Sequence, residues 1–146
     1  MKRLNFSPLP SGQHGTLRPA LEAAGLPADD LDAVGRAFFE LSDEAGPVGF
    51  VGLEGDGADR LLRSLVVLPG HKRQGHGGLL VAHVEAAARR NGARRLHLLT
   101  TGVADFFRAR GYCAADRADA PDAISATAQF ASLCPASATY LVKDLA

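Results

Sequence analysis

The sequence has 146 residues, of which 47% are apolar and 22% charged, and its formal net charge is zero. This composition is typical of a folded globular domain and excludes a disordered or collagen-like chain, so we expect a single domain over residues 1–146. No apolar run reaches membrane-spanning length, and polar residues and prolines interrupt the N-terminal segment where a signal peptide would be apolar. We therefore expect a cytoplasmic protein without a membrane partner.

The first half of the chain predicts helices followed by an antiparallel meander. Residues 2–6 suggest a short strand, and Thr16 can cap a helix that carries Leu17 and Leu21 and ends at Gly25. A second short helix is expected over residues 29–34. Three strands follow at 38–43, 48–54 and 60–68, separated by turns at 44–47 and 55–57.

The second half of the chain predicts a βαβ unit. Apolar residues recur at helical spacing over 78–91, and Asn91 and Gly92 end this helix. A strand over 95–100 completes a right-handed crossover, so it is expected to lie parallel to strand 60–68. A helix over 104–110, a strand over 112–116, a helix or helical turn over 121–130 and a strand over 138–144 complete the chain. The predicted fold class is α/β with a mixed (α+β) sheet.

Basic residues concentrate in one stretch of the chain. Residues 60–95 contain eight lysines and arginines but a single acidic residue, Glu85, and the rest of the chain is acidic. A nucleic-acid surface would also carry aromatic residues among the cations, and few are present. The stretch therefore indicates a small polyanionic ligand and no nucleic-acid partner.

The most informative segment, residues 61–81, joins an apolar strand to a helix through a basic, glycine-rich loop. The start of a helix presents unpaired N–H groups and the positive end of its dipole, which together bind phosphate. Lys72 and Arg73 add positive charge there. The loop lacks the Lys-Ser/Thr pair of a Walker motif and the third glycine of a dinucleotide fingerprint, so neither familiar nucleotide motif applies.

The same segment fits the pattern V-x-P-x-x-K/R-x-x-G-x-G-x-x-L through Val67, Pro69, Lys72, Gly75, Gly77 and Leu80. This pattern resembles the acetyl-CoA loop of the GNAT superfamily of N-acetyltransferases. Residues 104–112, ADFFRARGY, resemble the A-x-x-F-Y-x-x-x-G-F segment of that family. Residues 127–138 are similar to a small GNAT group of arsenic-resistance N-acetyltransferases. The resemblance implies a sheet splayed at its centre, acetyl-CoA as the acetyl donor and a homodimer.

The resemblance also implies which residues bind the cofactor. Backbone N–H groups of the loop would hold the pyrophosphate, and the strand before it would pair with the pantetheine arm at a bulge and polarise the thioester carbonyl. The cofactor-binding residues expected on this basis are Leu65, Val66, Val67, Lys72, Arg73, Gln74, Gly75, His76, Gly77, Gly78 and Phe107.

Glu54 is the candidate catalytic residue. An amine must be neutral to attack the thioester, and a carboxylate at the end of the neighbouring strand can accept its proton directly or through water. A solvated glutamate at a strand end is an equally good interpretation. Glu85 is expected at the surface. Many GNAT proteins protonate the departing thiolate with a tyrosine, but here that position is Phe107.

Arg63 and Ser64 are the candidate substrate-binding residues. Arg63, and less directly Arg36, offers a planar fork for a carboxylate, although a surface arginine is the competing interpretation. The resemblance implies a small amino-acid-like amine as acceptor, with an amine-bearing organoarsenical as one such compound. The alternative is a CoA-binding sensor or regulatory module with little turnover, which the missing tyrosine favours. A protein-modifying acetyltransferase is a third option.

The two cysteines, Cys113 and Cys134, suggest neither a disulfide framework nor a metal site. Two cysteines far apart in the sequence are too few for a disulfide scaffold, and too few for structural zinc without help from histidine. Cys134 beside Pro135 is more typical of a small buried apolar residue than of a reactive thiol. We therefore expect no metal.

Overall fold

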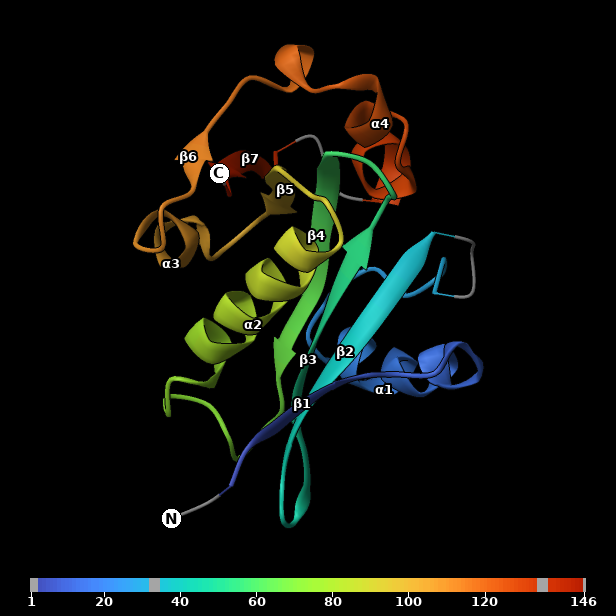
Figure 1. The fold of residues 1–146 in the computed structure, drawn as a ribbon, viewed down its shortest axis with the longest axis vertical. Helices are drawn as coiled ribbons and strands as arrows, with labels where there is room; N and C mark the ends of the chain where they lie inside the picture. Colours follow the sequence, from blue (N-terminus) through green and yellow to red (C-terminus); the bar gives the residue numbers. More distant parts are fainter. Residues whose placement is uncertain (1–2, 32–34, 134–136, 146) are drawn as a thin grey trace.

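The computed structural model describes residues 3–31, 35–133 and 137–145, and within these ranges the chain forms one seven-stranded sheet. The strands lie in the order β1-β2-β3-β4-β5-β7-β6 (Figure 1). The pair β4–β5 is parallel and the other neighbouring pairs are antiparallel. The strands are β1 (Asn5–Pro8), β2 (Arg36–Asp43), β3 (Gly46–Glu54), β4 (Asp59–Val67), β5 (Arg95–Thr100), β6 (Cys113–Ala114) and β7 (Thr139–Asp144).

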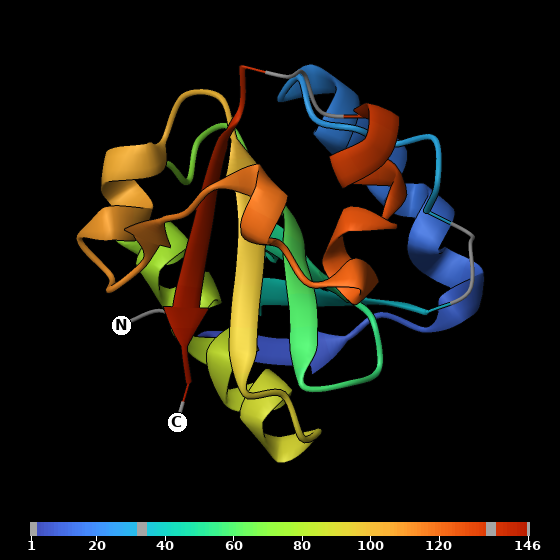
Figure 2. The same ribbon diagram turned by 90° about the horizontal axis from the view of Figure 1, so that it is seen from above.

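Helices cover both faces of the sheet. Seen from above in Figure 2, α2 (His76–Arg90) and α3 (Ala104–Arg108) lie on one side, and α1 (Arg18–Ala23) and α4 (Asp122–Ser125) lie on the other. Shorter helical turns are η1 (Ser11–Leu17), η2 (Arg117–Asp119) and η3 (Gln129–Leu133). Among the described residues, no helix combines the length and apolar character needed to cross a membrane.

Each face of the sheet has its own apolar core. Successive side chains of a strand point to opposite faces. Leu61 of β4 accordingly joins Ile124 of α4 in one cluster, whereas its neighbour Leu62 joins Leu80 and Val84 of α2 in another. A third cluster packs η1 and α1 against β2, β3 and β4 through Leu17, Leu21, Phe38, Phe50 and Val66.

The predicted fold class is confirmed, because β2, β3 and β4 form the antiparallel meander and β4, α2 and β5 form the βαβ unit. Several local expectations were wrong. Thr16 does not cap α1: its hydroxyl donates to the carbonyl of Gln13 inside η1. Residues 29–31 form a turn, while 32–34 lie outside the described residues. The segment 121–130, expected as a helix or helical turn, contains α4 and the start of η3, whereas the strand expected over 112–116 is only two residues long.

The central feature of the sheet is the divergence of β4 from β5. The two strands pair only from Asp59 to Leu61 with Arg95 to His97. Further along, β4 contains a β-bulge, because Arg63 lies opposite Gly52 and Val66 opposite Phe50, so two residues of β4 face one of β3. Ser64 in the bulge has a φ of 60°, which is unusual for a residue other than glycine.

A buried hydrogen-bonded chain ties three strands together where the divergence begins. The Tyr140 hydroxyl of β7 lies 2.6 Å from His97 Nδ1 of β5, and His97 Nε2 lies 2.7 Å from Asp59 Oδ1 of β4. Arg95 holds the same carboxylate at 2.9 Å. Burial lowers the pKa of His97 below its ordinary 6.5 by more than Asp59 raises it. Neutral His97 therefore donates to Asp59 through Nε2 and accepts from Tyr140 through Nδ1.

The hydrogen bonds of buried His97 predict that the stability of the protein depends on pH. Because the pKa of His97 is lower in the folded protein than its ordinary 6.5, the unfolded chain binds more protons at mildly acidic pH. The free energy of unfolding should therefore fall as the pH decreases from about 7 towards 5, where unfolded aspartates remain largely ionised. Urea unfolding of wild type and His97→Gln at both pH values measures this, and His97→Gln should lose much of the pH dependence.

The matched control is His83→Gln, the same exchange at an exposed position of α2. This variant leaves His97 and its partners in place, so its pH dependence should match that of wild type. An unchanged pH dependence in His97→Gln would assign the effect to other groups.

Candidate active site between β4 and β5

A cavity of about 440 Å³ lies where β4 and β5 diverge. That volume is within the range of small-molecule sites. Its walls are mostly apolar, with hydroxyl, amide and guanidinium groups at a few positions. The lining residues are Gly25, Leu26, Pro27, Leu62, Arg63, Ser64, Leu65, Leu98, Leu99, Thr100, Thr101, Val103, Phe107, Gln129 and Ala138.

The bulge of β4 forms one wall of this cavity. Arg63, Ser64 and Leu65 all line it. Arg63 still lies opposite Gly52 of β3, and Ser64 and Leu65 are the two residues at which β4 leaves that register. Val66 and Val67 follow the bulge and return to register opposite Phe50 and Gly49. Of the three strand residues expected to bind the cofactor, Leu65 lines the cavity, while Val66 and Val67 lie next to it along the strand.

Arg63 is the centre of a buried ionic cluster. Its Nη1 donates to Asp30 Oδ2 at 2.7 Å and to Glu54 Oε1 at 2.9 Å, and its Nη2 donates to Asp30 Oδ1 at 2.5 Å. Arg36 Nη2 lies 2.9 Å from Asp30 Oδ2 and 3.4 Å from Glu54 Oε2. The Arg63 side chain is fully buried, with 0% of its surface exposed. Two arginines and two carboxylates thus neutralise one another.

The cluster shifts the proton equilibria of its members. Burial tends to raise the pKa of Asp30, but the hydrogen bonds and charges of Arg63 and Arg36 outweigh it and lower this pKa to about 2. Burial likewise opposes the charged form of Arg63, yet Asp30 and Glu54 raise its pKa above the usual value. Asp30 and Arg63 therefore both remain charged at neutral pH.

Two members of this environment were missed from the sequence. Asp30 was assigned to a short helix and given no functional role, and no local pattern links it to a strand 33 residues away. Gln129, oriented with its amide oxygen towards Arg63, accepts hydrogen bonds from Nε at 3.2 Å and Nη2 at 3.3 Å. The available signal was indirect: Arg63 lies within a predicted strand, and an arginine buried there would need carboxylate partners.

The glycine-rich loop leads directly from β4 into α2. Gly75 caps the helix with a φ of 80°, and Arg73 has a φ of 65°. Lys72, Arg73 and Gln74 are exposed, and the first turn of α2 carries no acidic side chain. His76 Nδ1 lies 3.0 Å from the His71 carbonyl oxygen, which closes the loop on itself. This arrangement suits an anion at the start of the helix.

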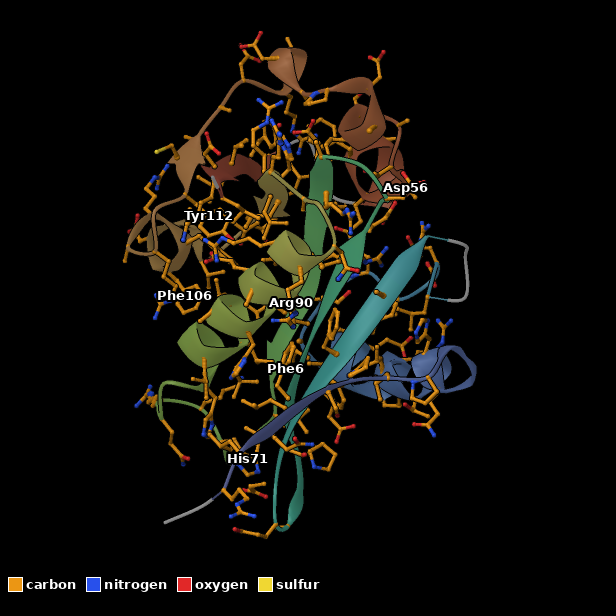
Figure 3. The ribbon with its side chains drawn as sticks, in the orientation of Figure 1. Phe6, Asp56, His71, Arg90, Phe106 and Tyr112 are labelled. Atoms are coloured by element: carbon orange, nitrogen blue, oxygen red, sulfur yellow. The ribbon has the colours of Figure 1, made fainter. Side chains whose placement is uncertain are left out.

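The glycines of the first turn of α2 also have a packing role. A Cβ atom on Gly77 would lie 3.2 Å from the Phe106 ring, and one on Gly78 would lie 2.7 Å from the Arg110 guanidinium. Figure 3 shows Phe106 beside this end of α2, above the loop that carries His71. The Arg110 guanidinium stacks 3.8 Å from the centre of the Phe106 ring. Close approach of the Phe106 ring of α3 therefore explains Gly77. The group beside Gly78 is the end of the flexible Arg110 side chain, and Gly75 faces open space.

Phe107 connects the loop and the cavity through α3. Its ring is buried and lines the cavity, while its neighbour Phe106 touches the first turn of α2. Phe107 packs edge-on against Phe106 and Tyr112. The Tyr112 hydroxyl donates to Glu85 Oε2 at 2.9 Å, which makes it a structural donor rather than a cavity residue.

Glu85 is buried, contrary to the expectation of a surface position. In addition to the Tyr112 hydroxyl, its carboxylate binds Lys143 Nζ at 3.0 Å. Cys113 is exposed, and Cys134 lies outside the described residues. No group of three or more histidine, cysteine, aspartate or glutamate side chains within the described ranges is arranged to hold a metal ion.

Comparison with protein families identifies an acetyltransferase domain. The model described as "Acetyltransferase (GNAT) domain" matches residues 35–114, which include β2 to β5, α2 and α3. Among curated proteins, none matches the sequence significantly.

Solved structures share the fold at low sequence identity. N-acetylglutamate synthase from Neisseria gonorrhoeae, complexed with coenzyme A and L-arginine, superposes with a TM-score of 0.78 at 20% identity, over 97% of this chain and 33% of that one. The chain thus spans about a third of that synthase. A GNAT acetyltransferase from Staphylococcus aureus Mu50 gives 0.79 at 15% identity, over 99% of this chain and 100% of that one.

Rv2747 from Mycobacterium tuberculosis, in complex with CoA, gives a TM-score of 0.78 at 16% identity over 99% of both chains. At such identities these similarities establish the fold alone. The family model covers more than half of the sequence and includes the loop and both strands that border the cavity. The chain therefore belongs to the GNAT acetyltransferase family.

Proposed function

We propose that the protein transfers the acetyl group of acetyl-CoA to the primary amine of a small amino-acid-like molecule. The observation that carries this proposal is the continuity of the anion-binding loop with the cavity. Phe106 contacts the start of α2, and the adjacent Phe107 lines the cavity between β4 and β5. A ligand with a phosphate group at one end and an extended arm would fit both places. Coenzyme A, present in several structures of similar fold, has that form.

In this proposal the cofactor uses backbone groups at both ends. The N–H groups between Lys72 and Gly78 bind the pyrophosphate, and the positive end of the α2 dipole adds to that attraction. The arm enters the gap between β4 and β5, and a backbone N–H near the bulge polarises the thioester carbonyl. Holding the thioester and the amine together contributes much of the rate enhancement without any side-chain chemistry.

The acceptor is the finer part of the proposal. Arg63 and Ser64 line the cavity, and a guanidinium suits the carboxylate of an amino-acid-like amine. The gonococcal synthase of similar fold was crystallised with coenzyme A and N-acetyl-glutamate, which is an acetylated amino acid. The resemblance of residues 127–138 to arsenic-resistance acetyltransferases adds an amine-bearing organoarsenical to the compounds to be tested.

A second candidate is a CoA-binding module with little turnover, and two observations favour it. Phe107 has no hydroxyl with which to protonate the departing thiolate, so water or the helix dipole would have to stabilise it. Glu54 is not among the residues that line the cavity, and its carboxylate is held by the Arg63 guanidinium at 2.9 Å. Proton transfer from an amine to Glu54 would therefore pass through water.

The two candidates differ in turnover. Release of free thiol from acetyl-CoA should be measured across a panel of primary amines that includes amino acids, their decarboxylated counterparts and an amine-bearing organoarsenical. An acetyltransferase gives saturable, amine-dependent thiol release and an acetylated product by mass spectrometry. Tight binding of acetyl-CoA in calorimetry, without turnover on any amine, would support the binding module instead.

The loop assignment predicts that Gly75→Val weakens acetyl-CoA binding about tenfold or more. A β-branched residue does not tolerate the φ of 80° at Gly75, so the loop must rearrange where the phosphates bind. Calorimetry with acetyl-CoA measures the effect. Gly92→Val is the matched control, because Gly92 has a φ of 90° at the other end of α2 and also faces open space. Equal affinities in the two variants would contradict the assignment.

The proposed role of Glu54 predicts a selective loss of turnover in Glu54→Gln. If Glu54 accepts the amine proton through water, kcat/KM should fall by roughly 100-fold to 10,000-fold while acetyl-CoA affinity is retained. Steady-state kinetics measures kcat/KM, and calorimetry measures the affinity for acetyl-CoA. Thermal unfolding shows whether the variant has also lost stability through damage to the ionic cluster. Glu22→Gln, an exposed change on α1, is the control. Wild-type turnover with an unchanged pH profile would assign proton removal elsewhere.

A further inference from the structure

Among the described residues that line the cavity, Arg63 is the only cationic one. Its guanidinium is fully covered in this structure, so a ligand could reach it only if one of its present partners moved away. Both oxygens of Asp30 bind it, Oδ2 on Nη1 at 2.7 Å and Oδ1 on Nη2 at 2.5 Å. This two-point pairing is the geometry in which an arginine binds the carboxylate of a ligand. Asp30 therefore occupies the position that an acceptor carboxylate would need.

Asp30 is the more exchangeable of the two carboxylates on Arg63. Glu54 is part of β3, where backbone pairing with β2 and β4 fixes its position. Asp30 lies in a turn, and its side chain is 13% exposed compared with 8% for Glu54. The turn follows Gly25, Leu26 and Pro27, which line the same cavity. Asp30 is thus linked by a short segment to the space that a ligand would enter.

Charge balance favours exchange over simple addition. The cluster pairs two guanidinium groups with two carboxylates, so a third carboxylate would be buried without a full counter-charge. If an acceptor carboxylate replaces Asp30 on Arg63, the charge around that guanidinium is unchanged. Asp30, whose side chain is already 13% exposed, would move out towards solvent, so two carboxylates still face the two guanidinium groups.

We propose that Asp30 is a specificity-determining residue that holds the acceptor-carboxylate subsite on Arg63 and is displaced from it when a carboxylate-bearing acceptor binds. This inference rests on the proposed function, since it concerns the acceptor side of the same cavity. The internal carboxylate weakens the binding of every competing carboxylate. It thereby limits occupancy of the cavity by small anions that lack other favourable contacts.

The test compares Asp30→Asn with Asp29→Asn. The first replaces the carboxylate on Arg63 with a neutral amide, which is a weaker partner for a guanidinium and is more easily displaced. The second makes the same charge change one residue away, in a side chain that is 84% exposed and paired with Arg18 at 3.5 Å. Three probes share one scaffold: phenylalanine, 2-phenylethylamine without the carboxylate, and 3-phenylpropionate without the amine.

Asp30→Asn should bind 3-phenylpropionate about tenfold more tightly than wild type in calorimetry, since one charged hydrogen-bond partner no longer competes. The KM for phenylalanine should fall by a similar factor, and that for 2-phenylethylamine should not change. Asp29→Asn should behave as wild type. Weaker or unchanged carboxylate binding in Asp30→Asn, or equal changes for all three probes, would overturn the proposal.

A measurement on the wild-type protein covers the case in which Asp30→Asn does not fold. Adding 3-phenylpropionate should shift the backbone amide resonances of residues 29–31, whereas 2-phenylethylamine should not. The absence of such shifts at saturating ligand would contradict displacement of Asp30. Both binding experiments are independent of turnover. If no amine is acetylated but carboxylate exchange is observed, the proposed function fails while the subsite remains.

Discussion

The structure depends on the short pairing between β4 and β5. A parallel pair that ends after Leu61 and His97 leaves a gap in the middle of the sheet, and the remaining architecture either maintains or lines that gap. The buried chain from Asp59 through His97 to Tyr140 fixes the closed end, and the bulge at Ser64 directs β4 away from β5. A continuous β4–β5 ladder would fill the space with backbone hydrogen bonds and remove the cavity.

Burial of Arg63 is the second constraint, and it connects segments that are distant in the sequence. A guanidinium without solvent contact requires carboxylates, and Asp30 and Glu54 supply them from the turn after α1 and from β3. Gln129 adds a neutral partner from η3. These partners of Arg63 therefore come from three parts of the chain outside β4. Losing one carboxylate would affect both the fold around the bulge and the chemistry of the cavity wall.

The sequence predicted what depends on local patterns. Short strand-like runs bounded by turn residues predicted the meander, and helical spacing predicted α2. The basic, glycine-rich loop from Pro69 to Gly78 indicated where an anion could bind at the start of that helix. The sequence did not predict long-range pairings. The helical pattern of α2 includes Glu85 but does not reveal that Tyr112 and Lys143 bind its carboxylate in the interior. Gly77 was interpreted through an anion, whereas the structure shows the Phe106 ring packed closely against it.

The two ends of the proposed site differ in how far local sequence patterns reveal them. The cofactor end is built from β4, its loop and the start of α2, which are contiguous in the sequence, so its motif is recognisable there. The acceptor end combines Pro27, Arg63, Thr100 and Gln129 from separate elements, and no short pattern specifies their arrangement. Acceptor choice can change through Asp30 or its turn without altering the loop. Recognition of the acetyl-CoA motif therefore identifies the family, whereas the acceptor must be inferred from three-dimensional contacts around Arg63.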